Sequence, residues 1–117
     1  MNIQIFGKNK CFDTKKAERY FKERKIKVQN IDLLRYGMST KEYESVKRAV
    51  GGYENLMDKN SKAYKNSCIE YLAYEKDKEN KLLENPELFL TPIVRNGQKA
   101  TVGYCPEVWK KWEEESK

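Results

Sequence analysis

Residues 2–21, NIQIFGKNKCFDTKKAERYF, contain a short apolar strand, a glycine turn and the beginning of a charged helix. The strand ends near Gly7, and Cys11 stands where the helix begins. The first N–H groups of a helix have no intrahelical partner and favour a negative charge. A cysteine at this position loses its proton more easily than a free cysteine, and the thiolate is the reactive form. The sequence therefore predicts that Cys11 is the functional centre.

The residues after Cys11 predict a helix followed by a second strand. A helix over about Asp13–Arg24 has apolar residues at i, i+3 and i+4 spacing, and residues 26–33 alternate like a strand. The helix residues predicted to face inward are Ala17, Tyr20 and Phe21. Because strand, helix and strand follow one another within about thirty residues, they predict a right-handed βαβ unit with parallel strands.

The middle of the chain predicts further helices. Ser39 and Glu42 form a capping box, and Met38 and Tyr43 are spaced for a hydrophobic staple. Gly51 ends this helix, whose apolar face is predicted to hold Tyr43, Val46, Ala49 and Val50. Residues 55–66 are polar and fit short helical turns. Residues 67–85 are predicted to be helical with breaks, and Cys68 within them is expected to pack in the interior.

The last third predicts a hairpin and a closing helix. Asn96-Gly97 lies between two β-prone runs, which indicates a tight turn in which both residues take a positive φ. Pro106 fits the first turn of a final helix. The apolar side predicted for this helix consists of Val108, Trp109 and Trp112.

The order of the predicted elements is β-α-β, a helical block and β-β-α. Two parallel strands and an antiparallel pair, covered by helices, make up the thioredoxin arrangement. The sequence therefore predicts an α/β fold with a mixed four-stranded sheet. We expect a single thioredoxin-like domain over residues 1–117, with a helical insertion at about 39–89.

The composition excludes several kinds of site. The chain has no histidine, which removes Ser-His and Cys-His catalysis and histidine-ligated metal sites. Its three cysteines, Cys11, Cys68 and Cys105, are widely spaced, unlike a disulfide framework or paired zinc ligands. We therefore expect neither a metal nor an organic cofactor.

The net charge of +6 is spread along the chain, and its densest positive excess is at Lys8–Lys16 around Cys11. Lysines there predict an electropositive setting that stabilises a thiolate. Direct nucleic-acid binding is not expected, because basic residues at such a face should cluster. No apolar run approaches the ~20 residues that cross a bilayer, and no secretory signal opens the chain. These features predict a cytoplasmic protein without membrane contact.

Three segments of the chain resemble the ArsC-type arsenate reductase family, which includes Spx-like transcription regulators and glutaredoxin-like members. They are IFGKNKCFDTKKAERYFKERKI (5–26), LMDKNSKAYK (56–65), and NPELFLTPIV (85–94) continuing through ATVGYCPEVW (100–109). The resemblance implies a thioredoxin fold, a redox-active Cys11 and a cis Pro92 beside it. The second cysteine of the family's Cys-x-x-Cys is replaced here by Thr14, which resembles a monothiol arrangement.

The resemblance also suggests roles for residues around Cys11. Lys8, Lys10 and Thr14 are predicted to tune the thiolate, Thr14 through a hydrogen bond from its hydroxyl. The backbone of Thr91, next to Pro92, is predicted to position a substrate peptide. Cys105 is a candidate resolving thiol, and its alternative is a structural role. For Phe12, the alternatives are shielding of the sulfur, a surface for a partner and a place in the core.

Arsenate reductases of this type hold their oxyanion with three arginines. The corresponding positions fall on Asp58, Thr91 and roughly Tyr104 or Cys105, none of which is arginine. An aspartate repels an oxyanion that an arginine would bind. Lys59, Lys62 and Arg95 are the cations available to compensate, but a lysine lacks the bidentate fork. The sequence therefore predicts that arsenate is not the substrate.

Two main functions follow from this reading. The first is a thiol-disulfide oxidoreductase in which Cys11 attacks glutathione-linked or protein disulfides, with glutathione as a co-substrate. The alternative is a Spx-like redox-responsive regulator that binds the RNA polymerase α subunit, although the two-cysteine switch is missing. A non-catalytic adaptor that retains the fold is a third reading.

Overall fold

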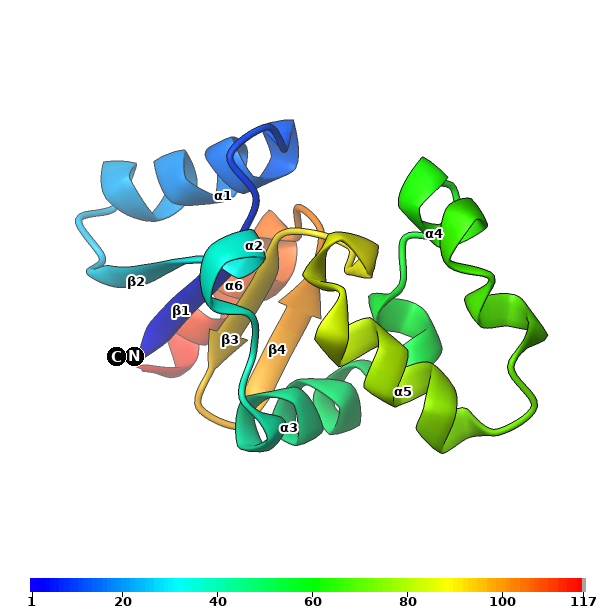
Figure 1. Ribbon diagram of the computed structural model, residues 1–117. Helices are drawn as coiled ribbons and strands as arrows, with labels where there is room; N and C mark the ends of the chain where they lie inside the picture. Colours follow the sequence, from blue (N-terminus) through cyan, green and yellow to red (C-terminus); the bar gives the residue numbers. More distant parts are fainter. Residues whose placement is uncertain (117) are drawn as a thin grey trace.

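A mixed four-stranded sheet with strand order β2-β1-β3-β4 lies at the centre of the computed structural model, which describes residues 1–116 (Figure 1). Its strands are β1 (Ile3–Gly7), β2 (Val28–Asp32), β3 (Ile93–Asn96) and β4 (Lys99–Val102). β1 pairs in parallel with β2 and antiparallel with β3, and β3 pairs antiparallel with β4. The predicted mixed sheet is confirmed.

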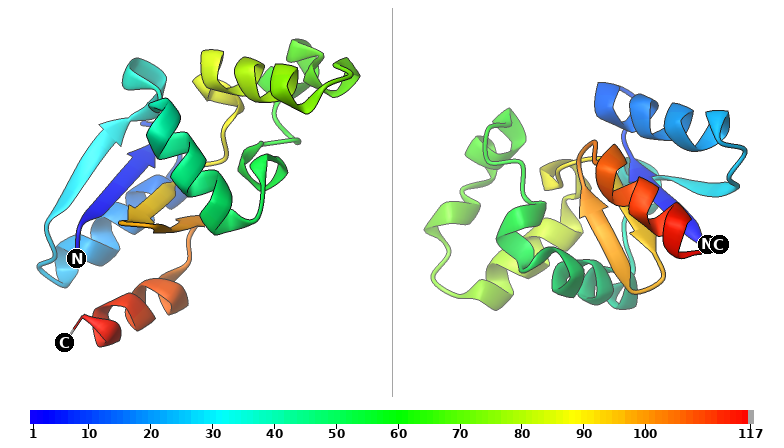
Figure 2. Two further views of the ribbon diagram at one scale, coloured as in Figure 1. Left: turned by 90° about the horizontal axis from the view of Figure 1, so that it is seen from below. Right: turned by 180° about the vertical axis from the view of Figure 1, so that it is seen from behind.

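Helices cover both faces of this sheet (Figure 2). The α-helices are α1 (Phe12–Glu23), α2 (Leu33–Tyr36), α3 (Thr40–Val50), α4 (Lys62–Ser67), α5 (Glu75–Glu84) and α6 (Pro106–Glu115). Short 3-10 helices are η1 (Tyr53–Leu56), η2 (Ile69–Tyr71) and η3 (Pro86–Leu88). No helix in the described part of the chain combines the length and the apolar character that crossing a membrane requires.

Alternation along the strands divides the core into two clusters. On one face, Ile3, Ile5 and Val94 pack with α1 and α6 through a buried cluster. Its helix members are Ala17, Tyr20, Phe21, Trp109 and Trp112, so these predicted inward positions are confirmed. On the other face, Phe6 and Ile93 pack with residues of α3 and of the helices between β2 and β3. The end of β1 is therefore held from both sides.

The capping box of α3 is present: the Ser39 hydroxyl accepts from the Glu42 N–H, and the Glu42 carboxylate accepts from the Ser39 N–H. Met38 and Tyr43 are both buried in the same cluster, as the staple predicted. Ala49 is exposed, so its assignment to the apolar face was wrong. That face is narrower than the sequence predicted and ends at half-buried Val50.

The second strand and the last helix each differ from the prediction in one respect. The second strand stops at Asp32, whose carboxylate accepts from the Leu34 N–H and begins the short helix α2. Leu33 and Leu34 are therefore helical rather than extended. Val108 is more than a third exposed, so α6 buries only its two tryptophans.

Cys68 takes a left-handed conformation with φ 58°, which ends α4 before η2 begins. Its side chain is exposed, so the predicted interior packing was wrong. The hairpin also differs in detail. Asn96 pairs with Lys99, which leaves Gly97 and Gln98 as the two turn residues. Only Gly97 has a positive φ (62°), the glycine-first pattern of a type II′ turn rather than type I′.

Candidate active site

Cys11 lies at the N-cap of α1, four residues after β1 ends. Its backbone is extended (φ −91°, ψ 116°), and its N–H donates to the Lys8 carbonyl at 3.1 Å, which closes the loop. The half-buried thiol donates from Sγ to the Thr91 carbonyl at 3.5 Å. The Thr91–Pro92 peptide bond is cis, as the resemblance implied. The fold thus brings together residues that are eighty positions apart in the sequence.

The surroundings of Cys11 lower its pKa. Burial alone would raise the pKa of this thiol. Hydrogen bonds from the side chains of Thr14 and Thr91, and from the backbone N–H groups of Thr14 and Asp13, outweigh burial because they stabilise the thiolate. The N–H groups at the start of α1 and the side chains of Thr14 and Thr91 therefore all act to lower the pKa of Cys11.

Thr14 is buried against Gly7, and the absence of a side chain at Gly7 makes room for it. A Cβ at Gly7 would lie 2.2 Å from Cγ2 of Thr14, a distance that real contacts do not reach. The Thr14 hydroxyl oxygen also accepts from the Lys8 N–H at 3.5 Å. Gly7 is therefore required for close packing between the end of β1 and the first turn of α1.

Removing the Thr14 hydroxyl is expected to raise the pKa of Cys11. The Thr14→Val side chain keeps the volume but lacks the donor, so burial of the thiolate is no longer offset to the same degree. Cys11 should then alkylate several-fold more slowly at neutral pH, measured with iodoacetamide by peptide mass mapping. The matched Thr14→Ser variant keeps the hydroxyl and should stay close to wild type. Equal pH profiles for the two variants would contradict this role for the hydroxyl.

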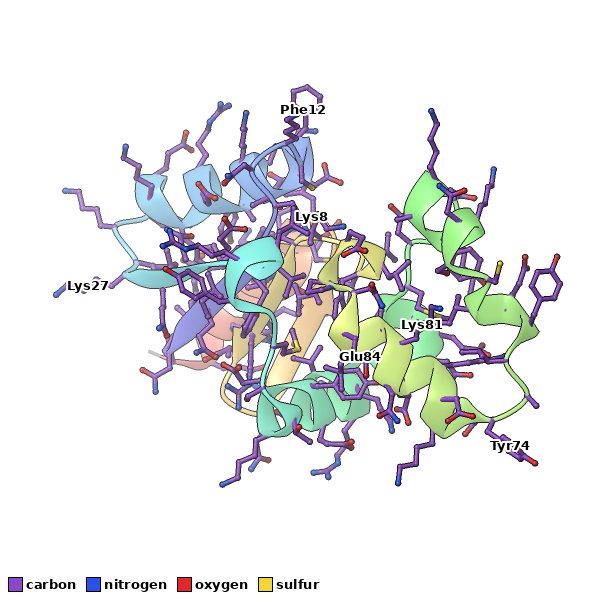
Figure 3. The ribbon with its side chains drawn as sticks, viewed as in Figure 1. Lys8, Phe12, Lys27, Tyr74, Lys81 and Glu84 are labelled. Carbon is purple, nitrogen blue, oxygen red and sulfur yellow. The ribbon has the colours of Figure 1, made fainter. Side chains whose placement is uncertain are left out.

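Lys8 connects the end of β1 to the segment that precedes Thr91. Its Nζ donates to the carbonyl oxygens of Glu87 at 3.0 Å and Phe89 at 2.7 Å. Burial lowers the pKa of Lys8, although the charges of Asp58, Cys11 and Glu87 oppose the shift. In Figure 3, Lys8 lies between α1 and the chain leading into β3. The sequence suggested that Lys8 acts as a charge near Cys11. Its hydrogen bonds to the carbonyls of Glu87 and Phe89 could not be predicted, because these residues lie far along the chain.

The remaining predicted site residues are Lys10, Pro92 and Cys105. Lys10 is exposed and forms no ion pair within residues 1–116. Pro92 is buried, and its carbonyl accepts from the Gly103 N–H at 2.8 Å. Cys105 is the N-cap of α6, and its Sγ donates to the Val102 carbonyl at 3.4 Å. Burial and the nearby Glu107 raise the pKa of Cys105, although a hydrogen bond from the Thr101 side chain acts in the opposite direction.

Two exposed aromatic side chains, Phe12 and Tyr104, lie beside lysines of α1, the helix that begins after Cys11. Phe12 is 78% exposed and points away from the molecule in Figure 3, so it does not belong to the core. The Nζ of Lys15 lies 6.0 Å from the centre of its ring. Tyr104, 43% exposed, has the Nζ of Lys16 at 5.7 Å from its ring centre. This side of the molecule therefore presents aromatic rings together with positive charge.

The residues considered above for an oxyanion site are Asp58 and the cations Lys59, Lys62 and Arg95. The Asp58 N–H donates to the Leu88 carbonyl at 2.8 Å, so Asp58 lies beside the segment leading to Thr91. Lys59 and Lys62 are exposed. Arg95 pairs across the sheet with Gln4, toward the end of β1 opposite Cys11, and Nη1 of Arg95 donates to Gln4 at 2.8 Å. Arg95 therefore does not replace a missing arginine at the thiol.

The part of the sequence that contains both Cys11 and Pro92 also matches a known protein family. The sequence model of the ArsC family matches residues 6–112. The chain belongs to the ArsC family. Among curated relatives, global transcriptional regulator Spx 2 of Oceanobacillus iheyensis is 29% identical over 107 residues, which cover 89% of this chain and 78% of that protein.

Solved structures of ArsC-family proteins share this fold. An arsenate reductase from Vibrio cholerae aligns with a TM-score of 0.82 and 22% identity, covering 95% of this chain and 97% of that one. A Bacteroides fragilis structure described as ArsC-family-related aligns with a TM-score of 0.80 and 21% identity, covering 95% and 97%. At these identities the likeness shows the fold, which is thioredoxin-like with the mixed β2-β1-β3-β4 sheet.

Proposed function

We propose that this ArsC-family protein is a monothiol, glutaredoxin-like thiol-disulfide oxidoreductase with Cys11 as its nucleophile. The observation that carries the proposal is the position of Cys11 at the start of α1, with Sγ 3.5 Å from the Thr91 carbonyl. Donors from Thr14, Thr91 and the helix start lower the pKa of Cys11, which increases the thiolate fraction at neutral pH.

The reaction consists of two exchanges. The Cys11 thiolate attacks one sulfur of a disulfide, the new sulfur–sulfur bond joins Cys11 to that sulfur, and the other sulfur leaves as a thiolate. A second thiolate then attacks the substrate-derived sulfur of the mixed disulfide and releases Cys11 as a thiolate. The backbone of Thr91 and Pro92 positions the substrate, while Lys8 holds the 87–89 segment that leads to Thr91.

The second thiol is proposed to come from glutathione or a partner protein. Thr14 occupies the position where a neighbouring cysteine would resolve the intermediate. Cys105, the other candidate, has a raised pKa, so less of it is thiolate at a given pH. Its Sγ is also directed to the Val102 carbonyl within its own loop. These features favour an external resolving thiol.

The proposal is tested by measuring Cys11 alkylation against pH together with reduction of a glutathione mixed disulfide. Because the folded pKa of Cys11 is lowered, its alkylation should persist at pH values where a free cysteine is already protonated, and should fall at still lower pH. Turnover should accompany this reactivity. If Cys11 had the pKa of a free cysteine and no turnover were measured, the proposed enzyme activity would be contradicted. A non-catalytic adaptor would then be the better explanation.

Arsenate is not expected to be reduced at an appreciable rate. The resemblance aligns Asp58 and Thr91 with positions where arsenate reductases of this type have arginines, and Arg95 donates to Gln4. A coupled assay with arsenate and glutathione should remain at the level of the Cys11→Ser variant. Turnover well above that level would show that other donors hold the oxyanion.

The second candidate function is a Spx-like regulator that binds the RNA polymerase α subunit. The similarity to the regulator of Oceanobacillus iheyensis favours it, and the exposed Phe12 supplies a surface for a protein partner. Retention of purified α subunit on the immobilised protein, with no glutathione-dependent turnover, would favour this reading over the enzyme.

A further inference from the structure

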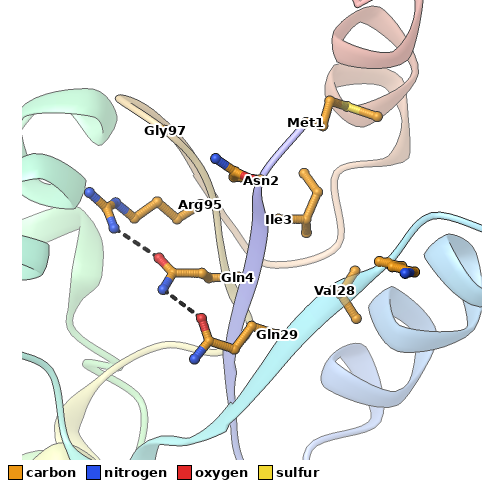
Figure 4. A pocket seen from close by; sticks show the side chains of 9 residues that line it. Met1, Asn2, Ile3, Gln4, Val28, Gln29, Arg95 and Gly97 are labelled. Atoms are coloured by element: carbon orange, nitrogen blue, oxygen red, sulfur yellow. Dashed lines mark hydrogen bonds between the residues drawn. The ribbon is translucent and has the colours of Figure 1, made fainter.

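A cavity of about 650 Å³ lies at the end of β1 opposite Cys11, on residues that the thiol chemistry does not use (Figure 4). It is bounded by the first residues of β1 and β2 and by the hairpin between β3 and β4. The polar and charged side chains lining it are Asn2, Gln4, Lys27, Gln29 and Arg95.

Three of these side chains form a row across neighbouring strands. Gln4 of β1 stands opposite both Gln29 of β2 and Arg95 of β3 in the sheet register. Arg95 donates from Nη1 to Oε1 of Gln4 at 2.8 Å, and Gln4 donates from Nε2 to Oε1 of Gln29 at 3.0 Å. In Figure 4 the three side chains form one hydrogen-bonded chain.

The direction of this chain follows from the chemistry of arginine. A guanidinium only donates, so Gln4 must turn its oxygen toward Arg95 and its amide nitrogen toward Gln29. The oxygens of both glutamines then accept bonds within the row. The groups of these three side chains that have no hydrogen-bond partner within the row are mainly N–H groups, including the amide nitrogen of Gln29. Such a surface suits an anion.

The charged side chains that line the cavity are positive, which also favours an anion. Arg95 and Lys27 line it, and among the described residues no aspartate or glutamate does. Arg95 forms no ion pair within residues 1–116, and its Nε is buried without a hydrogen-bond partner. A buried N–H without a hydrogen-bond partner and a half-buried charge without a counter-ion both cost free energy.

We propose that this cavity binds a small carboxylate, with Arg95 as its anchor and Gln29 as a second donor. Gln4 accepts only one N–H of Nη1, so the terminal Nη1 and Nη2 groups of Arg95 retain N–H groups that match the two oxygens of a carboxylate. Lys27 is exposed, so half-buried Arg95 is the one partly desolvated positive charge of the cavity, and it matches a singly charged carboxylate better than a doubly charged phosphate. The site is independent of the proposed thiol chemistry.

The test is a titration of the ¹⁵N-labelled protein with sodium acetate at constant ionic strength, followed by NMR. The Nε–H of Arg95 and the side-chain amides of Gln4 and Gln29 should shift together and saturate. Sodium chloride should leave them in place, and inorganic phosphate should bind more weakly than acetate. Absence of saturable shifts with acetate, or tighter binding of phosphate, would overturn the proposal.

Three variants separate a specific site from general surface charge. Arg95→Met should weaken acetate binding at least about tenfold, since a charged hydrogen-bonding partner is lost. Arg35→Met removes the same charge from an exposed position and should change binding by less than about twofold. Arg95→Lys keeps the charge but not the fork and should also bind weakly. Unchanged acetate binding by Arg95→Met, or full binding by Arg95→Lys, would contradict the proposal that the Arg95 guanidinium holds the carboxylate. Unchanged backbone chemical shifts away from the site would verify that each variant is folded.

Discussion

The Cys11→Ser variant is expected to lose glutathione-dependent disulfide reduction almost completely, by about a thousandfold or more in kcat/KM. Serine fits the N-cap of α1 well, so the helix and the fold should be retained. Its hydroxyl is not ionised at neutral pH, however, and cannot form the mixed disulfide. The effect is therefore expected on the chemical step, and circular dichroism should be unchanged.

The other two cysteines supply matched controls for this variant. Cys68→Ser alters an exposed thiol and should leave turnover unchanged. Cys105→Ser should retain turnover when glutathione is supplied, because the resolving thiol is then external. Loss of activity in Cys105→Ser, with the mixed disulfide accumulating on Cys11, would instead identify Cys105 as the resolving thiol. Activity that survives Cys11→Ser would refute the assignment of the nucleophile.

Trp109→Ala is expected to produce the largest loss of stability, about 3–5 kcal/mol in the free energy of unfolding. Trp109 is fully buried between the sheet and α1, with the rings of Tyr20 and Phe21 each 5.2 Å away, centre to centre. Its Nε1 donates to the Thr101 hydroxyl at 2.8 Å. Alanine would leave a cavity below the helix that carries Cys11. Denaturant unfolding followed by circular dichroism measures the loss.

Two milder changes divide this effect into packing and hydrogen bonding. Trp109→Phe keeps an aromatic ring against Tyr20 and Phe21 and should cost clearly less than alanine. Thr101→Val leaves the buried indole N–H without a partner, which typically costs about 1–3 kcal/mol. If Trp109→Ala unfolded at the same denaturant concentration as the wild type, the packing of α6 against α1 would not stabilise the fold as we expect.

Much of the site could be predicted from short-range patterns. Cys11 follows a strand and a turn and precedes an amphipathic helix, and these local signals place a thiol at a helix start without knowledge of the rest of the fold. The capping box at Ser39 and the buried face of Ala17, Tyr20 and Phe21 were predicted for the same reason. Capping and helical periodicity depend on residues only a few positions apart.

The predictions for Leu33, Leu34 and Cys68 were wrong because each of these residue types is compatible with two different local structures. Leu33 and Leu34 are apolar and fit a strand, but Asp32 caps a helix start and ends the strand first. Cys68 is apolar enough for a core, yet its left-handed conformation ends α4 and leaves it exposed. Neither outcome changes the hydrophobic pattern, so periodicity alone could not distinguish the alternatives.

By itself, the sequence determined the order of strands and helices and the position of Cys11 at the start of α1, because both depend on neighbouring residues. The tertiary structure alone decided which distant groups surround that thiol. It brought the Thr91 carbonyl to 3.5 Å from the sulfur and the Lys8 ammonium to the carbonyls of Glu87 and Phe89. It also aligned Gln29, Gln4 and Arg95 across three strands. These contacts join residues from 25 to 91 positions apart, so they depend on how the strands pair and on where the segments that leave them run, which no pattern of neighbouring residues determines.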